Sequence, residues 1–289
     1  MKGIILSGGL GTRLRPITTV VSKQLLPVYD KPMIYYPLST LLSAGIREIA
    51  LISTPQALPQ FNELLGDGSR FGVRITYIPQ NTPAGIAQAF LLAEDFIGKD
   101  SVTLILGDNI FHGADRTITD CIQVFTSGCS LFGYRVKDPT QYGVATFNEY
   151  NQITKIVEKP SKPKSNIAIT GLYVYDNTVI EKSKSIKPSA RGELEITDLN
   201  NVYIQNSSAK LYTLNGAWLD MGSPDGLLQA ANYVKTLQER QGIQIGCLED
   251  IALKNKAIQK DKLVKACEFH NGTLYGEYLK SVVGEFDRC

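Results

Sequence analysis

Short apolar runs alternate with longer helical patterns through the first half of the chain. The runs are typical of buried strands because they are brief, apolar and bounded by polar or glycine-containing segments. Helical spacing follows over 33–44, where Gly45 suits a left-handed C-cap, and over 86–96, which ends near Gly98. The alternation predicts βαβ units, and therefore an α/β fold with a Rossmann-like, mostly parallel central sheet flanked by helices. The predicted strands are residues 3–6, 48–52, 73–78, 102–106 and 130–134.

From Tyr142 onward the pattern changes to shorter alternating strands, interrupted by a Lys/Pro/Ser-rich loop over 159–165. We expect a mixed-sheet part beside the main sheet. Its predicted strands are residues 144–147, 153–157 and 167–174.

The chain beyond Ser223 has no strand pattern. Ser223 is a good N-cap and Pro224 fits the first turn of a helix. We therefore predict one domain over 1–289, with a core of about 1–222 and a helical C-terminal appendage of about 223–289. The apolar residues at helical spacing that support this appendage are Leu227, Leu228, Ala231, Val234 and Leu237.

Composition excludes several classes of protein. A chain of 289 residues with 43% hydrophobic composition can bury a sizeable core. The formal net charge of +2 gives no electrostatic footprint for a nucleic acid or an anionic membrane, so we expect neither partner. Five cysteines without a C-x-x-C pair, together with only two histidines, favour a reduced compartment. No leader-like or membrane-spanning run is present, and we expect a cytoplasmic protein.

A glycine-rich segment, 7–16, directly follows the first predicted strand. Glycines there let backbone N–H groups approach phosphate oxygens without a Cβ in the way, although a plain tight turn is the alternative interpretation. The segment is not a dinucleotide fingerprint, because the sixth position from Gly9 is Leu14, and no Gly-Lys-Ser/Thr follows for a P-loop. Arg13 and Lys23 bring cations to the place where a triphosphate would lie.

Two aspartates follow apolar runs. Asp108 comes after the predicted strand 102–106, which places its carboxylate at the carboxyl end of a strand, where open α/β sheets bind ligands. Asp220 follows 217–219 in the same way. A pair of hard carboxylates, with phosphate oxygens and waters, could satisfy octahedral Mg²⁺. Taken alone, Asp108 could also be an ordinary Asx-turn residue.

Two further polar residues suggest ligand contacts. Lys159 follows the predicted strand 153–157, and Pro160 is expected to force an extended conformation that could aim the ammonium inward. A solvated loop lysine is the alternative for this position. Gln24 offers both a donor and an acceptor, as the edge of thymine or uracil requires.

Several motifs in order resemble one family. Gly-Gly-x-Gly-Thr-Arg-Leu-x-Pro over 8–16, followed by Lys-Gln-Leu-Leu-Pro-Val over 23–28, resembles the signature of the sugar nucleotidyltransferases. The glutamine that follows the lysine, Gln24, resembles the residue found there in the thymidylyltransferase branch, whose members use glucose-1-phosphate. The likeness covers essentially the whole chain. It continues through residues 29–40, 107–111, 158–160, 191–198 and 218–220.

The resemblance implies a reaction. A family member would transfer dTMP from dTTP to α-D-glucose-1-phosphate, giving dTDP-glucose and pyrophosphate as the first step of dTDP-deoxysugar biosynthesis of the dTDP-rhamnose type. The attack is an in-line displacement at the α-phosphorus, so catalysis rests on positioning and on charge stabilisation. The implied catalytic residues are Arg13, Lys23 and Lys159, and the implied cofactor is Mg²⁺ bound by Asp108 and Asp220. The family's C-terminal helices imply a homotetramer, and in the thymidylyltransferases they carry a second nucleotide site for end-product inhibition.

The resemblance also assigns the remaining binding residues. The nucleotide-binding positions are Leu6, Gly8, Gly9, Gly11, Thr12, Arg13, Lys23, Gln24, Gln80, Pro83, Gly85 and Asp108. The sugar-binding positions are Asn109, Tyr142, Gly143, Glu158, Lys159, Ile169 through its backbone, and Glu193.

Alternatives and departures qualify this hypothesis. A glutamine amide does not read the thymine methyl, so a uridylyltransferase using UTP is the second candidate. A non-catalytic nucleotide-sugar sensor on the same scaffold is the third, although the four implied charged residues around the metal are all present. The family commonly has other residues at Ser7, Ala84, His112 and Met221. His112 and His270 are interpreted as structural or regulatory, because an ionised phosphate attacks without a general base.

Overall fold

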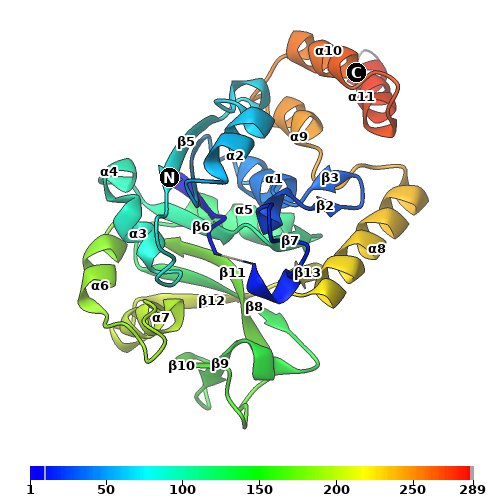
Figure 1. Ribbon diagram of the computed structural model, residues 1–289. Helices are drawn as coiled ribbons and strands as arrows, with labels where there is room; N and C mark the ends of the chain where they lie inside the picture. The colour runs from blue at the N-terminus through cyan, green and yellow to red at the C-terminus, as the bar shows by residue number, and fades with distance from the viewer. Residues whose placement is uncertain (10, 287–289) are drawn as a thin grey trace.

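The computed structural model describes residues 1–9 and 11–286, and its centre is a nine-stranded sheet (Figure 1). The strand order is β10-β9-β11-β6-β1-β4-β5, with β8 pairing both β11 and β12. The strands of this sheet are β1 (Lys2–Leu6), β4 (Glu48–Ser53), β5 (Arg74–Pro79), β6 (Val102–Leu106), β8 (Cys129–Arg135), β9 (Gly143–Phe147), β10 (Ile153–Glu158), β11 (Ile167–Tyr175) and β12 (Ala209–Thr213). Two small sheets are formed by β2 (Pro27–Val28) with β3 (Lys31–Pro32), and by β7 (Asn109–His112) with β13 (Ala217–Asp220).

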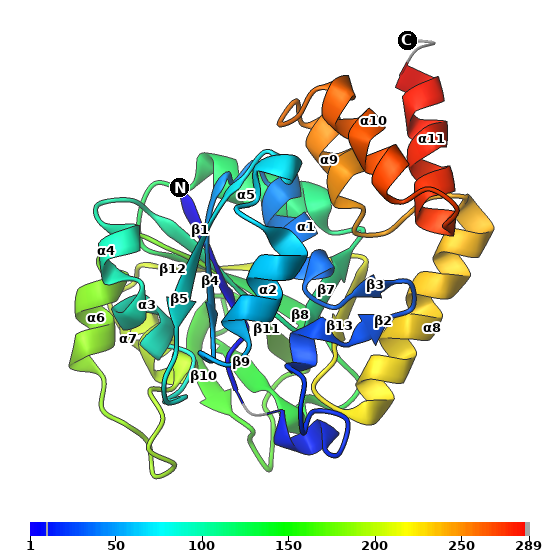
Figure 2. The ribbon, with the colours of Figure 1, turned by 45° about the horizontal axis from the view of Figure 1, so that its top comes forward.

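The helices cover both faces of the sheet and continue beyond it at the C-terminal end (Figure 2). They are α1 (Tyr35–Ser43), α2 (Leu58–Leu65), α3 (Gln88–Leu92), α4 (Glu94–Ile97), α5 (Asp115–Val124), α6 (Val179–Ser185), α7 (Ile196–Gln205), α8 (Pro224–Gln241), α9 (Leu248–Lys254), α10 (Lys260–Phe269) and α11 (Leu274–Phe286). Short 3₁₀ turns are η1 (Thr12–Leu14), η2 (Lys23–Leu25), η3 (Ser69–Phe71) and η4 (Pro139–Gln141).

The predicted parallel core is confirmed. Strands β6, β1, β4 and β5 are parallel neighbours, and Ile4 of β1 lies between Leu104 of β6 and Ala50 of β4. The predicted mixed part differs in one respect: β11 pairs antiparallel with β6, and β9 and β10 continue from β11. The mixed strands therefore extend the main sheet instead of forming a separate one beside it.

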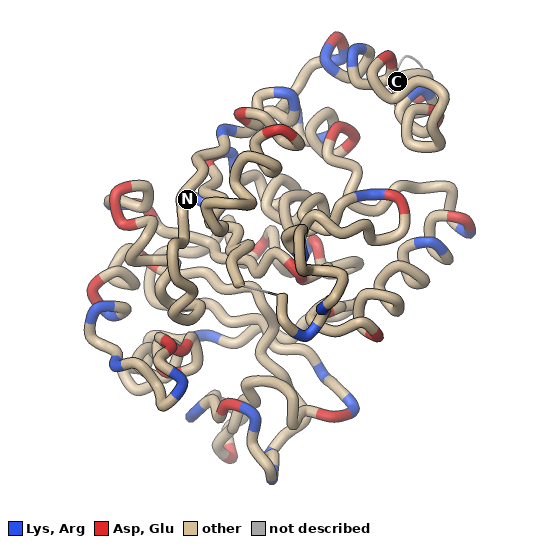
Figure 3. The backbone as a smooth tube through the Cα atoms, viewed as in Figure 1, with Lys and Arg blue, Asp and Glu red and all other residues tan. Residues whose placement is uncertain are grey.

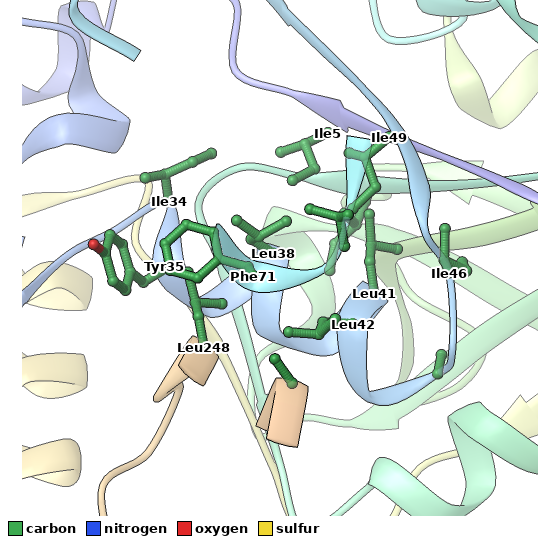
Figure 4. Packing of buried hydrophobic residues seen from close by; sticks show 14 of the residues in the cluster. Ile5, Ile34, Tyr35, Leu38, Leu41, Leu42, Ile46, Ile49, Phe71 and Leu248 are labelled. Atoms are coloured by element: carbon green, nitrogen blue, oxygen red, sulfur yellow. The ribbon is translucent and has the colours of Figure 1, made fainter. Parts of the chain in front are cut away.

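Alternate residues of β1 pack into two different hydrophobic clusters. Ile4 and Leu6 pack in the cluster that contains Phe90 of α3, whereas Ile5 packs in the cluster that contains α1 and α9. Figure 4 shows α1 side chains between Ile5 of the sheet and Leu248 of α9. Burial on both faces explains why the parallel strands are nearly continuous apolar runs in the sequence.

The C-terminal helices are joined closely to the core. Ser223 caps α8 by accepting a hydrogen bond from the Gly226 amide, as predicted. The predicted apolar stripe is wrong at Leu228, which is 61% exposed, because the buried face of α8 runs through Ala230 and Val234. Val234 packs in a cluster with core residues such as Met33. The beginning of the predicted appendage is thus part of the core, and α10 and α11 lie farthest from the sheet (Figures 1 and 2).

One helix prediction needs correction. The pattern over 86–96 forms two short helices, α3 and α4, which meet at Ala93. Helix α7 begins at Ile196, so the predicted sugar-binding residue Glu193 lies in the loop before it. Gly45 and Gly98 have positive φ angles of 83° and 58°, as the predicted helix ends require.

Charge and cysteine positions complete the picture. Figure 3 shows charged residues of both signs spread around the outline of the molecule. Within the described residues, no helix is long and apolar enough to cross a bilayer. Cys121, Cys129, Cys247 and Cys267 are buried free thiols, and Cys289 lies outside the described residues.

Candidate active site

The glycine-rich loop leaves the carboxyl end of β1 beside the turn that follows β6. The Gly107 amide donates to the Leu6 carbonyl (2.9 Å), which ties the two strand ends together. Gly9 and Gly11 have φ angles of 96° and 57°, a region that favours glycine. Thr18 Oγ1 donates to the Gly11 carbonyl (2.7 Å) and holds the loop against η1. Leu10, within this loop, lies outside the described residues.

Four charged residues predicted from widely separated motifs meet at this end of the sheet. The Lys23 ammonium donates to Asp108 Oδ2. The β7–β13 ladder pairs Asp220 with the residue after Asp108, and the Met221 amide donates to the Asp108 carbonyl (3.0 Å). Arg13 lies beside Asp220, because a Cβ added at Gly222 would be 2.8 Å from Arg13 Nη2 and 3.0 Å from Asp220 Oδ1.

The electrostatics of this cluster suit a cation. Burial, and then the neighbouring Asp108 carboxylate, raise the pKa of Asp220, while Lys23 and Arg13 act in the opposite direction. Asp220 Oδ1 also accepts a hydrogen bond from the Gly222 amide (2.9 Å), which fixes the carboxylate. Among the described residues no group of three or more His, Cys, Asp or Glu side chains could hold a metal. Two hard carboxylates nevertheless fit Mg²⁺, which keeps several waters.

Asn109 holds Asp108 in place. Its Nδ2 donates to Asp108 Oδ1 (3.0 Å), and its Oδ1 accepts from Trp218 Nε1 (2.6 Å) and from the Gly171 amide (3.2 Å). The side chain predicted to bind sugar is thus hydrogen-bonded to Asp108, Trp218 and Gly171 within the chain. Trp218, which is also buried in a core cluster, therefore helps to position the site, and no sequence motif predicts this contact.

A buried amide lies where the base was expected. Gln80 is 2% exposed, and a Cβ added at Gly8 would be 1.7 Å from Gln80 Oε1. Gln80 Oε1 and Ser7 Oγ are both buried without a hydrogen-bond partner in the described part of the chain. Gln24 is also buried, and its Oε1 accepts from Ser22 Oγ (2.9 Å). Unpaired buried polar atoms are rare in folded proteins, so their clustering here indicates a ligand site.

The nucleotide and sugar segments are hydrogen-bonded to each other. The Leu194 amide donates to the Ala84 carbonyl (2.8 Å), and the Ala87 amide donates to the Leu194 carbonyl (3.2 Å). Gly85 has a φ angle of 95° and passes so close that an added Cβ would be 2.3 Å from the Leu194 carbonyl oxygen. Predicted residue Gly85 therefore lies directly against the segment that contains Glu193. The departure at Ala84 leaves these backbone contacts intact.

The predicted sugar side lies on β9, β10 and β11. Glu158 pairs with Gly143 across β9 and β10, and Glu158 Oε2 accepts from Thr197 Oγ1 (2.7 Å). The Lys159 amide donates to the Tyr142 carbonyl (3.0 Å). The expected extended conformation of Lys159 is wrong, since its φ is 41°, in the left-handed region. That hydrogen bond to Tyr142 keeps the backbone turned, and the lysine side chain stays half-exposed.

Aromatic side chains connect the sugar side with the acidic cluster. The Tyr142 and Trp218 rings are 5.1 Å apart, and Trp218 holds Asn109 beside Asp108. Burial, followed by the negative charges of Glu158, Cys129 and Asp108, raises the pKa of Tyr173 of β11. The other predicted positions are Leu6 in β1, Thr12 in η1, exposed Pro83 after β5, and buried Ile169 in β11.

A hollow adjoins the glycine loop. A cavity of about 220 Å³ is lined by Gly9, Ser22, Lys23 and Thr54 among others. Glycine, hydroxyl groups and an ammonium are the groups that bind phosphate oxygens. With an acidic pair, two cations and a buried amide nearby, the site has the parts needed to hold a nucleoside triphosphate.

This combination of a parallel sheet, a glycine-rich loop and an acidic pair at the strand ends defines a nucleotide-transferring protein, and the chain belongs to the nucleotidyl transferase family, whose model matches residues 2–236. It is therefore a nucleotidyltransferase. Curated relatives of this chain include glucose-1-phosphate thymidylyltransferases. The one from Neisseria gonorrhoeae is 51% identical over 99% of this chain and 100% of its own. The one from Mycolicibacterium smegmatis is 49% identical over 96% of this chain and 98% of its own.

Solved structures agree with the fold. A Bacillus anthracis protein assigned as a glucose-1-phosphate thymidylyltransferase, in complex with sucrose, matches with a TM-score of 0.76 and 43% identity. The match covers 81% of this chain and 94% of that one. A UDP-glucose pyrophosphorylase complexed with UDP-glucose matches with a TM-score of 0.73 at 24% identity, which bears on the fold alone. The resemblance drawn from the sequence motifs is confirmed.

Proposed function

We propose that this nucleotidyltransferase transfers dTMP from dTTP to α-D-glucose-1-phosphate. An oxygen of the sugar phosphate forms a bond to the α-phosphorus while the bond from that phosphorus to the bridging oxygen breaks, and pyrophosphate leaves. The names of the curated relatives support these substrates. The observation that carries the proposal is the meeting of Arg13, Lys23, Asp108 and Asp220 beside the glycine-rich loop.

Each group in this cluster has a separate task. Arg13 and Lys23 would bind the triphosphate and stabilise negative charge that develops on its oxygens. Lys159 would bind the phosphate of the sugar; its half-exposed ammonium forms a long ion pair with Glu158 Oε1 (3.9 Å), which the ligand phosphate would replace. Because the attacking phosphate is already ionised, the chain needs no general base.

Mg²⁺ is proposed as the cofactor, with Asp108 and Asp220 as its protein ligands. When bound, the ion would neutralise charge on the phosphate oxygens and help to align the two anionic substrates. The raised pKa of Asp220, caused first by burial and then by Asp108, supports a buried acidic pair that a bound cation would stabilise. Asn109 would orient Asp108 through its amide.

Pyrophosphate release tests the proposal directly. The protein is mixed with Mg²⁺, glucose-1-phosphate and, in separate reactions, dTTP, UTP, CTP or ATP. Release that depends on both substrates and is fastest with dTTP supports the proposed function. Faster release with UTP would identify the uridylyltransferase instead, and nucleotide binding without release in any reaction would identify a sensor.

Other properties stay predictions. They are the cytoplasmic location, the homotetramer and the use of the product in dTDP-deoxysugar biosynthesis of the dTDP-rhamnose type. Light scattering tests the assembly, since a mass near 31.8 kDa would mean a monomer.

A further inference from the structure

Gln88, the first residue of α3, connects the nucleotide loop with the buried amide of Gln80. Gln88 Oε1 accepts from the Ala84 amide (2.9 Å) and from Gln80 Nε2 (2.8 Å). One side-chain oxygen therefore joins the backbone of the loop after β5 to the side chain of Gln80, the first residue after β5. No motif in the sequence analysis singled out Gln88.

The identity of each amide atom follows from these contacts. A backbone N–H can only donate, so the atom of Gln88 that faces Ala84 must be its oxygen. The same oxygen faces Gln80, so Gln80 must present its nitrogen. The Gln80 oxygen then points away from Gln88 and lies against Gly8, buried and without a partner. Rotating the Gln80 amide by half a turn would place two oxygens against each other.

The free oxygen has a defined chemical preference. It accepts hydrogen bonds and cannot donate them. Thymine and uracil carry an imide N–H at N3, whereas cytosine has a lone pair there, which a carbonyl oxygen repels. Gly8 allows this buried, unpartnered oxygen to lie against the glycine-rich loop, because any larger residue would place its Cβ 1.7 Å away.

We propose that Gln88 is a positioning residue that fixes the orientation of the Gln80 amide, so that the enzyme accepts nucleotides with an imide N–H and rejects cytosine nucleotides. The inference rests on the proposed function, since it assumes that a pyrimidine base binds beside Gln80. It selects thymine and uracil alike over cytosine, because the contact does not involve the methyl group or the ribose.

Two substitutions at one position separate this role from a general effect on the loop. Gln88→Met removes the acceptor at nearly constant volume, whereas Gln88→Glu keeps an oxygen for both donors. The measurement is the ratio of kcat/KM for dTTP to that for dCTP, with glucose-1-phosphate and Mg²⁺. Gln88→Met should lower this ratio by about tenfold or more, the effect of one mispaired hydrogen bond. Gln88→Glu should keep the ratio within about threefold.

A double substitution shows whether Gln88 acts through Gln80. If it does, adding Gln88→Met to Gln80→Met leaves the ratio of that single variant unchanged. A further fall in the double variant, a normal ratio in Gln88→Met, or an equal loss in Gln88→Glu would each overturn the inference. The ratio of dissociation constants, from calorimetry with dTTP and dCTP alone, needs no turnover. Failure of the proposed transfer and failure of the positioning role are therefore separate results.

Discussion

Lys23 and a bound Mg²⁺ would both contact the Asp108 carboxylate. Removing the Lys23 ammonium is therefore expected to strengthen Mg²⁺ binding and to slow turnover. The Lys23 ammonium donates to Asp108, and each of the two side chains is only 15% exposed. At an effective dielectric constant of about 20, two unit charges about 4 Å apart interact by roughly 4 kcal/mol, and an ammonium and a divalent ion on one carboxylate repel by at least about this amount. Partial solvent exposure reduces this to about 2 kcal/mol. Removing the ammonium should therefore favour metal binding.

The perturbation is Lys23→Met, which keeps the length of the side chain and removes its charge. The substrate-free variant should bind Mg²⁺ about thirtyfold more tightly, which is 2 kcal/mol expressed as a ratio of about 30 in Kd. Its turnover should nevertheless fall by about 10²- to 10³-fold, because the ammonium no longer stabilises charge on the triphosphate. Calorimetric titration with MgCl₂ and pyrophosphate release measure the two effects.

The control is Asp220→Asn, which should weaken Mg²⁺ binding both alone and combined with Lys23→Met. Unchanged or weaker Mg²⁺ binding by Lys23→Met would refute the reasoning, because Lys23 and the metal would then not share Asp108. A loss of turnover without tighter Mg²⁺ binding would not support a shared Asp108 carboxylate.

Three further changes test the surroundings of the site. Asp220→Asn should raise the Tm of the ligand-free protein at pH 7, because burial and Asp108 raise the pKa of Asp220 and make its ionised form unfavourable. The gain should shrink as pH falls toward the ordinary aspartate pKa of about 4, where Asp220 is protonated in any case, and thermal melts showing a constant gain would contradict this. Gly85→Ala should lower the free energy of unfolding by about 2–3 kcal/mol in urea titrations, since its Cβ would meet the Leu194 carbonyl at 2.3 Å. Gly192→Ala, with a similar φ but open space around it, is the matched control and should cost about 1 kcal/mol; equal losses would show that backbone strain alone matters. Trp218→Phe should cost about 1–2 kcal/mol and lower kcat by about two- to tenfold, because Asn109 loses a partner, and unchanged kcat would separate Trp218 from the orientation of Asp108.

Much of the fold could be predicted because its signals are local. A strand buried on both faces must be apolar throughout, so residues 102–106 identified β6 without knowledge of its neighbours. The cap at Ser223 is likewise decided within one helical turn. Leu228 was misplaced because helical spacing shows which residues share a face, but the width of the buried face depends on what packs against it.

The sequence predicted which residues form the site, but it did not predict which of them contact one another. Motif positions such as Lys23 and Asp108 were placed in one site by resemblance, but their direct hydrogen bond depends on the tertiary arrangement. The partners of Asn109 lie in two other strands, so no spacing rule reveals that Trp218 holds it. Gln88 was missed for a similar reason, since a glutamine that begins a helix has no local signature. The turned backbone of Lys159 opposes the ordinary preference of a residue before proline.

The β7–β13 ladder explains why the departures from the family pattern leave the acidic pair intact. Asp108 precedes β7 and Asp220 ends β13, so their separation is set by backbone pairing and not by the side chains around them. Met221 contributes its amide to the Asp108 carbonyl, while its side chain is buried in the cluster under α8. His112 occupies the far end of the same ladder and bonds Tyr233 of α8 through Nδ1 (2.8 Å). Substitutions at these two positions alter packing against α8, whereas the position of the carboxylates depends on hydrogen bonds that any residue with a backbone N–H can make.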